Sequence, residues 1–346
     1  MKRSFMFICA AALLLTGCGA SADEASAQLF AMDTVMQLDA YGHQVKQAVS
    51  DAEETIQALE ARLSRTREDS LVSVLNQNGA AQDLSAAEQA LLSEALTFRD
   101  ATGGAFDITI APVMDAWGFT GDSYRVPAQD ELDALLENVN SDEIRLSGSS
   151  VTLGARQAID LGGIAKGYTS DCVEAVFREN KIESGKISLG GNVFVLGGKP
   201  DGADWRVGIR DPQDENALAA VLTLRDAYAI TSGGYERYFT ENGNTYHHII
   251  DPSTGYPADS GLLSVTVVAE ANGPDFAGPG NGTMCDAFST ALFVMGEERA
   301  LEFWRTGGYD FDLVLVTADG RVIITDGLSD RFEAVKDSGY TYETVS

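Results

Sequence analysis

Apolar and polar residues alternate along the first part of the chain in patterns typical of both strands and helices. Residues 28–42, QLFAMDTVMQLDAYG, alternate as a strand does, and residues 44–64 carry apolar residues at helical spacing. A second helix is predicted over 86–101, where Gly103 and Gly104 follow as the usual residue type of a C-terminal cap. The pattern then predicts a short helix opened by Pro127, strands at 151–154 and 157–160, and a helix that runs from a glycine corner to Asn180.

The pattern after Lys186 is mostly that of β-strands. Short β-branched or alternating runs are bounded by Gly, Asp and Pro, and helices are predicted only at Cys285–Met295 and Glu297–Thr306. Strands in groups and helices in groups favour an α+β fold with mixed or antiparallel sheets over a doubly wound parallel sheet. Since no clean linker interrupts the pattern, we expect residues 29–346 to form a single catalytic domain.

The composition fits a soluble globular protein and narrows its partners. Hydrophobic residues make up 45% of the 346 residues and charged residues 22%. The chain has 24 Lys and Arg against 52 Asp and Glu, which gives a formal net charge of −28. Because DNA and anionic lipid would be repelled by such a chain, we expect no nucleic-acid partner.

The first residues have the features of an export signal. MKRSFMFICAAALLLTGC (1–18) begins with Lys2 and Arg3, continues with an apolar run too short for a lasting membrane span, and ends in small residues before Cys18. The ending resembles a bacterial lipobox, so we expect a signal peptide over 1–17, lipidation of Cys18, and a tether over 18–28 that anchors the domain on the extracytoplasmic face of the cell membrane. The alternative is a plain secreted protein cut near the same point. Either way, Cys172 and Cys285 remain in the folded part, where the sequence leaves their redox state open.

The segment DLGGIAKGYTSD (160–171) combines a carboxylate, adjacent glycines and Lys166 just before a predicted helix. Glycines allow backbone N–H groups to approach anionic oxygens, and a helix N-terminus attracts them. This pattern suits a phosphate-bearing ligand or its metal ion, and on local grounds it suits the following alternative equally well. The alternative is a tight turn with a solvated lysine.

A second candidate for binding chemistry lies on the predicted helix that begins near Cys285. Asp286 and Thr290 are four residues apart and therefore share a helix face. A carboxylate with a hydroxyl is an oxygen pair suited to Mg²⁺. The alternative is that Asp286 only caps the helix or interacts with its dipole.

Taken together, the motifs of the chain resemble those of the ApbE-type flavin transferases, formerly described as thiamine-biosynthesis lipoproteins. The resemblance implies the fold of that family and a Mg²⁺-dependent enzyme that moves the FMN moiety of FAD to a threonine or serine hydroxyl of a partner protein and releases AMP. Typical acceptors are membrane redox-pump subunits and other exported flavoproteins. The motifs that carry the resemblance are Met32-Asp33-Thr34, Leu63-Ser64, Gly104 to Asp107, Trp117-Gly118-Phe119, Asp160 to Tyr168, Gly190-Gly191-Asn192, Thr231-Ser232-Gly233, His248 to Pro252, Thr254 to Pro257 and Asp286 to Thr290.

The resemblance also implies roles for single residues. The Mg²⁺ ligands would be Asp286, Thr290 and the backbone carbonyl of Gly163. His248 would be the base that removes the proton of the acceptor hydroxyl, although Asp286 or a metal-polarised hydroxyl could serve instead, and His248 could simply bond to a turn. The positions implied to contact FAD are Met32, Ala105, Phe106, Asp107, Asp160, Lys166 and Ile250, the last with an uncertainty of one residue toward Ile249.

Two departures from the family pattern and two alternative functions stay open. Thr66 stands where many members have an aromatic residue, and the Gly- and Pro-rich segment 271–284 is longer than usual, so we expect it to be a surface loop. Water in place of the acceptor would make the protein an FAD pyrophosphatase that yields FMN and AMP. A flavin-binding lipoprotein without chemistry is a third hypothesis, which Asp286, Thr290 and His248 disfavour because a scavenger needs neither metal ligands nor a base.

Overall fold

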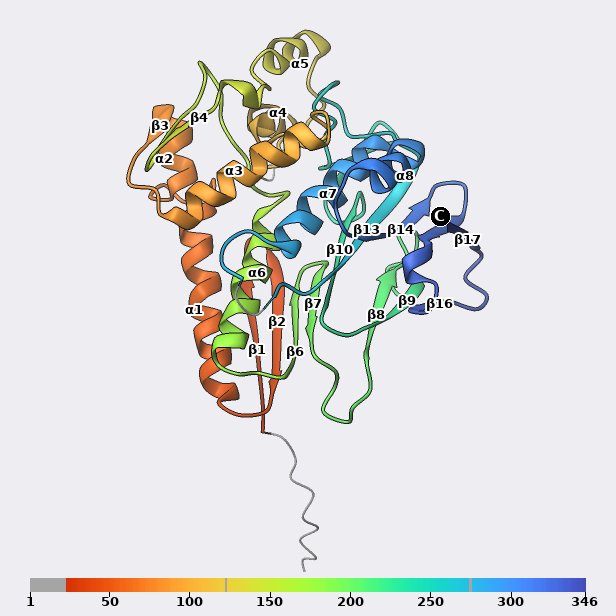
Figure 1. Ribbon diagram of the computed structural model, residues 1–346. Helices are drawn as coiled ribbons and strands as arrows, with labels where there is room; N and C mark the ends of the chain where they lie inside the picture. Colours follow the sequence, from red (N-terminus) through yellow and green to blue (C-terminus); the bar gives the residue numbers. More distant parts are fainter. Residues whose placement is uncertain (1–22, 122, 274–275) are drawn as a thin grey trace, which may run out of the picture.

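A computed structural model describes residues 23–121, 123–273 and 276–346. Its centre is a nine-stranded sheet in the order β1-β2-β6-β7-β10-β13-β14-β15-β17 (Figure 1). All neighbouring pairs in it are antiparallel except β15 and β17. The strands of this sheet are β1 (Glu24–Ala31), β2 (Thr34–Tyr41), β6 (Ser184–Leu189), β7 (Asn192–Leu196), β10 (Ala227–Gly233), β13 (Leu262–Glu270), β14 (Asp312–Thr317), β15 (Arg321–Thr325) and β17 (Thr341–Val345).

Helices cover one face of this sheet. The largest buried cluster lies between the sheet and α1 (Val45–Leu63), α6 (Ala165–Glu179) and α7 (Asn281–Met295), where Phe177, Phe194 and Phe288 are fully buried. Further helices extend the molecule beyond the ends of the strands, at the top of Figure 1. They are α2 (Leu71–Asn78), α3 (Ala86–Ala101), α4 (Ala111–Trp117) and α5 (Gln129–Leu136), and α8 (Glu297–Thr306) follows α7 directly.

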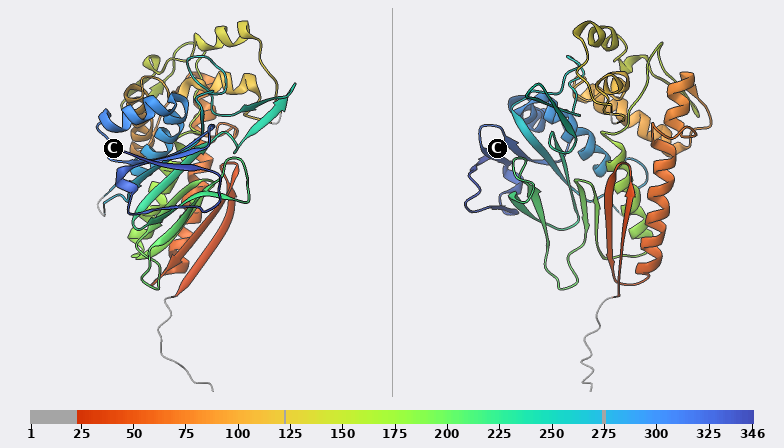
Figure 2. Two further views of the ribbon diagram at one scale, coloured as in Figure 1. Left: turned by 90° about the vertical axis from the view of Figure 1, so that its right-hand side faces the viewer. Right: turned by 180° about the vertical axis from the view of Figure 1, so that it is seen from behind.

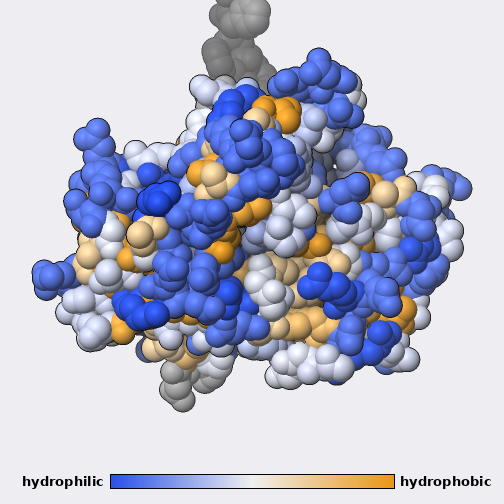
Figure 3. Space-filling model, turned by 90° about the horizontal axis from the view of Figure 1, so that it is seen from above, coloured by the Kyte–Doolittle hydropathy of each residue, from blue (hydrophilic) through white to orange (hydrophobic). Residues whose placement is uncertain are grey.

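Smaller sheets complete the fold. β8 (Trp205–Arg210), β9 (Leu218–Leu224) and β16 (Phe332–Ala334) cover the second face of the large sheet through a separate apolar cluster. The hairpin of β11 (Tyr238–Glu241) and β12 (Asn244–His247) projects from the body (Figure 2), and β3 (Ala80–Ala81), β4 (Arg145–Ser147) and β5 (Ser150–Thr152) form the last sheet. The face shown in Figure 3 is mainly hydrophilic, with smaller hydrophobic areas between polar side chains, in keeping with the high net charge.

The α+β class predicted from the sequence is confirmed, and the helix over 86–101 has the predicted bounds. The strand predicted at 157–160 is wrong. The backbone N–H and C=O of Ile159 pair with the side-chain amide of Asn76 at 2.7 and 2.9 Å, so a side chain from α2 takes the place of a neighbouring strand. Both α2 and α4 are absent from the sequence-based prediction.

The predicted strand at 28–42 is a hairpin of two strands. Met32 and Asp33 form its turn with φ of 48° and 59°, values that suit a tight two-residue connection. Because β1 begins at Glu24, residues 24–28 of the predicted tether belong to the sheet. The predicted signal peptide and Cys18 lie outside the described residues.

The segment 271–284 is only partly the surface loop that the sequence predicted. Its last residues open α7, and Gly282 and Thr283 are buried. The carboxylate of Asp171 on α6 accepts hydrogen bonds from the backbone N–H groups of Gly280, Gly282 and Thr283, each at 2.8 Å. A buried aspartate from another helix therefore caps α7, and this arrangement draws the end of the segment into the core.

Two further observations concern membrane-spanning helices and disulfides. Among the described residues, we find no helix that combines the length and apolarity needed to cross a membrane. Within the described residues, Cys172 and Cys285 form no disulfide.

Candidate functional site

A cleft of about 430 Å³ opens where the hairpin turn between β1 and β2, the glycine corner before α6, the segment just before β11 and the helix α7 meet. It brings together every position that the resemblance implies for FAD, metal and base. These positions are Met32, Ala105, Phe106, Asp107, Asp160, Gly163, Lys166, His248, Ile250, Asp286 and Thr290.

A close crossing of α6 and α7 forms the floor of the cleft. A Cβ atom on Gly167 would lie 2.2 Å from the carbonyl oxygen of Gly282 and 2.5 Å from Cβ of Asp286. Only glycine allows the two helices to approach this closely. The crossing places Asp286 beside the first turn of α6.

The carboxylate of Asp286 is almost completely buried, with 3% of the residue exposed. Its Oδ2 accepts a hydrogen bond of 2.7 Å from the backbone N–H of Gly167, and its Oδ1 lies 4.0 Å from Nζ of Lys166. Asp286 is the sixth residue of α7, so it does not cap this helix. Oδ1 makes no hydrogen bond within the described part of the chain, which leaves it available as a ligand atom.

Thr290 and the glycine corner face each other across the cleft. A Cβ atom on Gly163 would lie 3.4 Å from Oγ1 of Thr290, and the hydroxyl of Ser232 lies 3.2 Å from the same atom. Across the described ranges, no group of three His, Cys, Asp or Glu side chains is placed to hold a metal. A cation here would depend on Asp286 Oδ1, the Thr290 hydroxyl and the Gly163 carbonyl, an all-oxygen set that fits Mg²⁺.

Asp160 is fixed by two protein donors. Its Oδ1 accepts from the backbone N–H of Gly162 at 2.7 Å, and its Oδ2 accepts from Nη1 of Arg65 at 2.8 Å. The N-cap of α6 is Ile164, so Asp160 does not cap this helix. Lys166 in the first turn donates to the carbonyl of Gly162 at 3.3 Å and lines the cleft, where it is about three-quarters buried.

His248 lies at the end of the β11–β12 hairpin with one ring nitrogen engaged. Its Nδ1 is 3.1 Å from the backbone carbonyl of Arg237. Because a carbonyl can only accept, Nδ1 carries the proton and Nε2 keeps its lone pair. Burial lowers the pKa of His248 to about 4, and the positive charge of Lys166 adds to the effect. The imidazole is therefore neutral at neutral pH.

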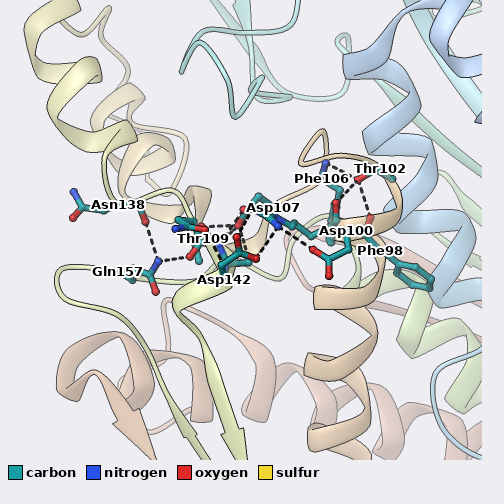
Figure 4. Close-up of polar contacts among 12 residues, drawn as sticks. Phe98, Asp100, Thr102, Phe106, Asp107, Thr109, Asn138, Asp142 and Gln157 are labelled. Atoms are coloured by element: carbon teal, nitrogen blue, oxygen red, sulfur yellow. Dashed lines mark hydrogen bonds and ion pairs between the residues drawn. The ribbon is translucent and has the colours of Figure 1, made fainter.

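Asp107 has a different environment from the other acidic residues of the cleft. Its Oδ1 accepts from the backbone N–H and the hydroxyl of Thr109 at 2.8 and 2.6 Å and from the hydroxyl of Ser141 at 2.5 Å (Figure 4). Nε of Arg99 lies 3.6 Å from Oδ2. This carboxylate therefore braces the wall of the cleft behind Phe106.

Comparison with known proteins decides the family. Residues 32–312 match the model of the ApbE family. The chain belongs to the ApbE family. Among the relatives of this ApbE family member is the FAD:protein FMN transferase of Treponema pallidum, 33% identical over 308 residues, which cover 83% of the chain and 82% of the relative.

Further comparisons agree with this assignment. The FAD:protein FMN transferase of Haemophilus influenzae is 32% identical over 79% of both chains. The crystal structure of the ApbE protein of Thermotoga maritima superposes with a TM-score of 0.78 at 29% identity, covering 91% of this chain and 97% of the other.

The cleft of this family member also contains residues to which the sequence analysis gave no role. Arg65 and Arg237 line it, as does Ser232, whose hydroxyl lies 2.8 Å from that of Ser289 and 3.2 Å from that of Thr290. Ser232 lies inside a quoted motif, and Arg65 directly follows another. Their positions inside or next to the motifs could have marked them as candidate site residues. The side chains they contact, however, belong to segments far apart in the chain.

Proposed function

We propose that this protein is an FAD:protein FMN transferase. The oxygen of an acceptor serine or threonine would form a bond to the FMN phosphorus, the bond between that phosphorus and the bridging oxygen would break, and AMP would leave. The observation that carries the proposal is that one cleft collects all eleven positions implied by the sequence motifs. The names of the relatives support it.

Charge and shape of the cleft support a role in FAD binding. Lys166 supplies a cation at the glycine corner, where backbone N–H groups and the start of α6 favour anionic oxygens. Met32, Ala105, Phe106 and Ile250 supply apolar surface of the kind that a flavin or adenine ring needs. In this proposal Asp160 accepts hydrogen bonds from FAD, and Asp107 supports the wall from behind.

Proton removal is assigned to His248. Nδ1 is held by the Arg237 carbonyl, so Nε2 is the atom that would receive the proton of the acceptor hydroxyl. The lowered pKa keeps the imidazole unprotonated at neutral pH, as a base must be. Oδ1 of Asp286 remains the alternative acceptor because it makes no hydrogen bond within the described residues.

Asp286, Thr290 and the Gly163 carbonyl would hold a Mg²⁺ ion. When bound, the ion would supply Lewis-acid stabilisation of the charge that builds up on the pyrophosphate oxygens. The bond between Gly167 N–H and Asp286 Oδ2 would keep the other carboxylate oxygen directed into the cleft.

We further propose that the protein acts as a lipoprotein on the extracytoplasmic face of the cell membrane and that its acceptor is an exported or membrane redox protein. The lipobox-like sequence before Cys18 supports this. The Cys18→Ala variant should then appear in the soluble fraction of cells, whereas the wild-type chain should sediment with the membranes. An unchanged distribution would contradict the anchor.

The activity is tested by measuring AMP release from FAD and Mg²⁺ with the full chain in detergent, with and without a candidate acceptor domain. Transfer predicts that AMP release depends on the acceptor and is lost in Asp286→Asn. Equal AMP release without the acceptor would favour the pyrophosphatase. Intact FAD in both reactions would favour a flavin-binding protein.

A further inference from the structure

Arg65 makes a bridge between two carboxylates at the wall of the cleft. Nη1 donates to Oδ2 of Asp160 at 2.8 Å, and Nη2 donates to Oδ1 of Asp115 at 2.7 Å and to the carbonyl of Ala111 at 3.4 Å. Only 13% of the Arg65 side chain is exposed. The planar guanidinium thus links the glycine corner to α4, two segments that are far apart in the sequence.

The backbone of Arg65 is fixed as well. Its carbonyl accepts a hydrogen bond of 2.8 Å from the hydroxyl of Ser73 on α2, and the Ser64 carbonyl accepts one from Ser70. The side chain therefore starts from a rigid point between α1 and α2. The hydroxyl of the neighbouring Thr66 lies 3.1 Å from that of Ser64, and the backbone N–H of Thr66 donates to the Ser64 hydroxyl at 3.2 Å.

This arrangement determines how Asp160 faces the cleft. With Oδ1 bound to Gly162 and Oδ2 bound to Arg65, the carboxylate has one orientation. Each carboxylate oxygen has two lone-pair sites, so Asp160 can still accept a hydrogen bond from a ligand. Arg65 also offsets the charges of Asp115 and Asp160 at a site where an anionic substrate would bind to a chain of net charge −28.

We propose that Arg65 is a positioning residue that holds Asp160 in the orientation required for FAD recognition. The inference rests on the proposed function, because it assigns FAD as the ligand of the cleft. Arg65 acts on binding, since it is anchored to the cleft wall by Asp160 and Asp115 and makes no hydrogen bond to His248, Asp286 or Thr290 within the described residues. Its loss should therefore weaken FAD binding and leave the chemical step nearly unchanged.

The test compares Arg65→Met and Arg65→Lys with the wild-type full chain. FAD affinity is measured by titration of flavin fluorescence, and KM and kcat by AMP release with an acceptor domain. Loss of hydrogen bonds to a charged group predicts that Arg65→Met raises the Kd and KM for FAD by about ten-fold or more. We expect kcat to change by less than about three-fold. Arg65→Lys cannot reach both carboxylates with a rigid fork, so its Kd and KM for FAD should lie between those of the wild type and those of Arg65→Met.

A double-mutant cycle separates positioning from a general charge effect. If Arg65 acts through Asp160, Arg65→Met should weaken binding much less in an Asp160→Asn background than in the wild type. The matched control is Arg206→Met, which removes an exposed ion pair with Glu333 on the β8-β9-β16 sheet and should leave FAD binding unchanged.

Several results would overturn the inference. One is an unchanged Kd for FAD in Arg65→Met. A second is that the effects of Arg65→Met and Asp160→Asn on the free energy of FAD binding are additive. A third is a fall in kcat with KM unchanged. If Arg65→Met fails to fold, Asp115→Asn serves instead, because it frees one side of the guanidinium. This variant should raise the Kd for FAD by a smaller factor than Arg65→Met. An unchanged Kd in Asp115→Asn would count against the inference. Failure of the wild-type chain to bind FAD would instead overturn the proposed function itself.

Discussion

The ammonium of Lys166 lies 4.0 Å from Oδ1 of Asp286, although 120 residues separate the two in the sequence. The crossing of α6 and α7 produces this proximity. It places a cation suited to phosphate oxygens beside a carboxylate oxygen suited to a metal ion. A pyrophosphate with its Mg²⁺ ion needs both kinds of group at the same place.

Replacement of Asp286 by Asn should abolish most of the activity. The amide keeps the size of the side chain but removes the charge that a Mg²⁺ ligand needs, so we expect kcat/KM to fall by about a hundred-fold or more. Rates measured over a Mg²⁺ titration check this. Asp204→Asn at an exposed surface ion pair is the control and should behave as the wild type. Full activity of Asp286→Asn would rule out the proposed metal site.

Replacement of Gly167 by Ala should destabilise the fold. The added methyl group would overlap the Gly282 carbonyl and Cβ of Asp286, which forces the two helices apart. Overpacking of this kind costs about 1–3 kcal/mol of unfolding free energy. Urea denaturation measures the loss, and Gly121→Ala, where no atom lies within 4 Å of the new Cβ, should change stability little. Equal effects of the two substitutions would contradict the close crossing.

His248 should make stability depend on pH below neutrality. Its pKa is about 4 in the folded chain against the ordinary histidine value of about 6.5, so the unfolded state binds more protons between these pH values. Stability should therefore fall as the pH falls from 6.5 to about 4, by up to about 3 kcal/mol from this residue. His248→Gln should reduce that slope in denaturation experiments at several pH values. The pKa of His247 is also lowered by burial, and its contribution, of the same sign, should persist in the variant.

Replacement of Asp107 by Ala should lower the free energy of unfolding, whereas the FAD affinity of the folded protein should be affected less. The change leaves the Thr109 and Ser141 donors without their acceptor in a buried place, which costs about 1–3 kcal/mol for each unsatisfied group. Thermal unfolding and FAD titration at low temperature separate the two effects. If stability is unchanged while FAD binding is lost, Asp107 contacts the ligand directly.

The sequence predicted which residues gather at the cleft better than the helix crossing that brings them together. Motif residues such as Asp160, Gly163, Asp286 and Thr290 were found because the flavin transferase resemblance identifies them residue by residue. Their proximity, however, depends on the Gly167–Gly282 crossing, which involves residues 115 positions apart and leaves no local signal.

The errors in the predicted elements have physical causes of the same kind. Residues 157–160 have strand-like spacing but pair with the side chain of Asn76, which only the folded chain brings near. The β1–β2 turn was missed because Met32 and Asp33 are not the Asn-Gly type that signals a hairpin. The bridge from Arg65 to Asp115 and Asp160 joins three distant segments, so a single sequence could not predict it.

This cleft is proposed to transfer FMN to a protein hydroxyl. The most direct test is intact-mass spectrometry of a candidate acceptor domain after incubation with the full chain, FAD and Mg²⁺. We expect the acceptor to gain one FMN on a single Ser or Thr, with no gain when Asp286→Asn replaces the wild type. The acceptor should be a domain that a related transferase modifies under the same conditions. If this domain remains unmodified while FAD is cleaved to FMN and AMP, the proposed transfer is contradicted.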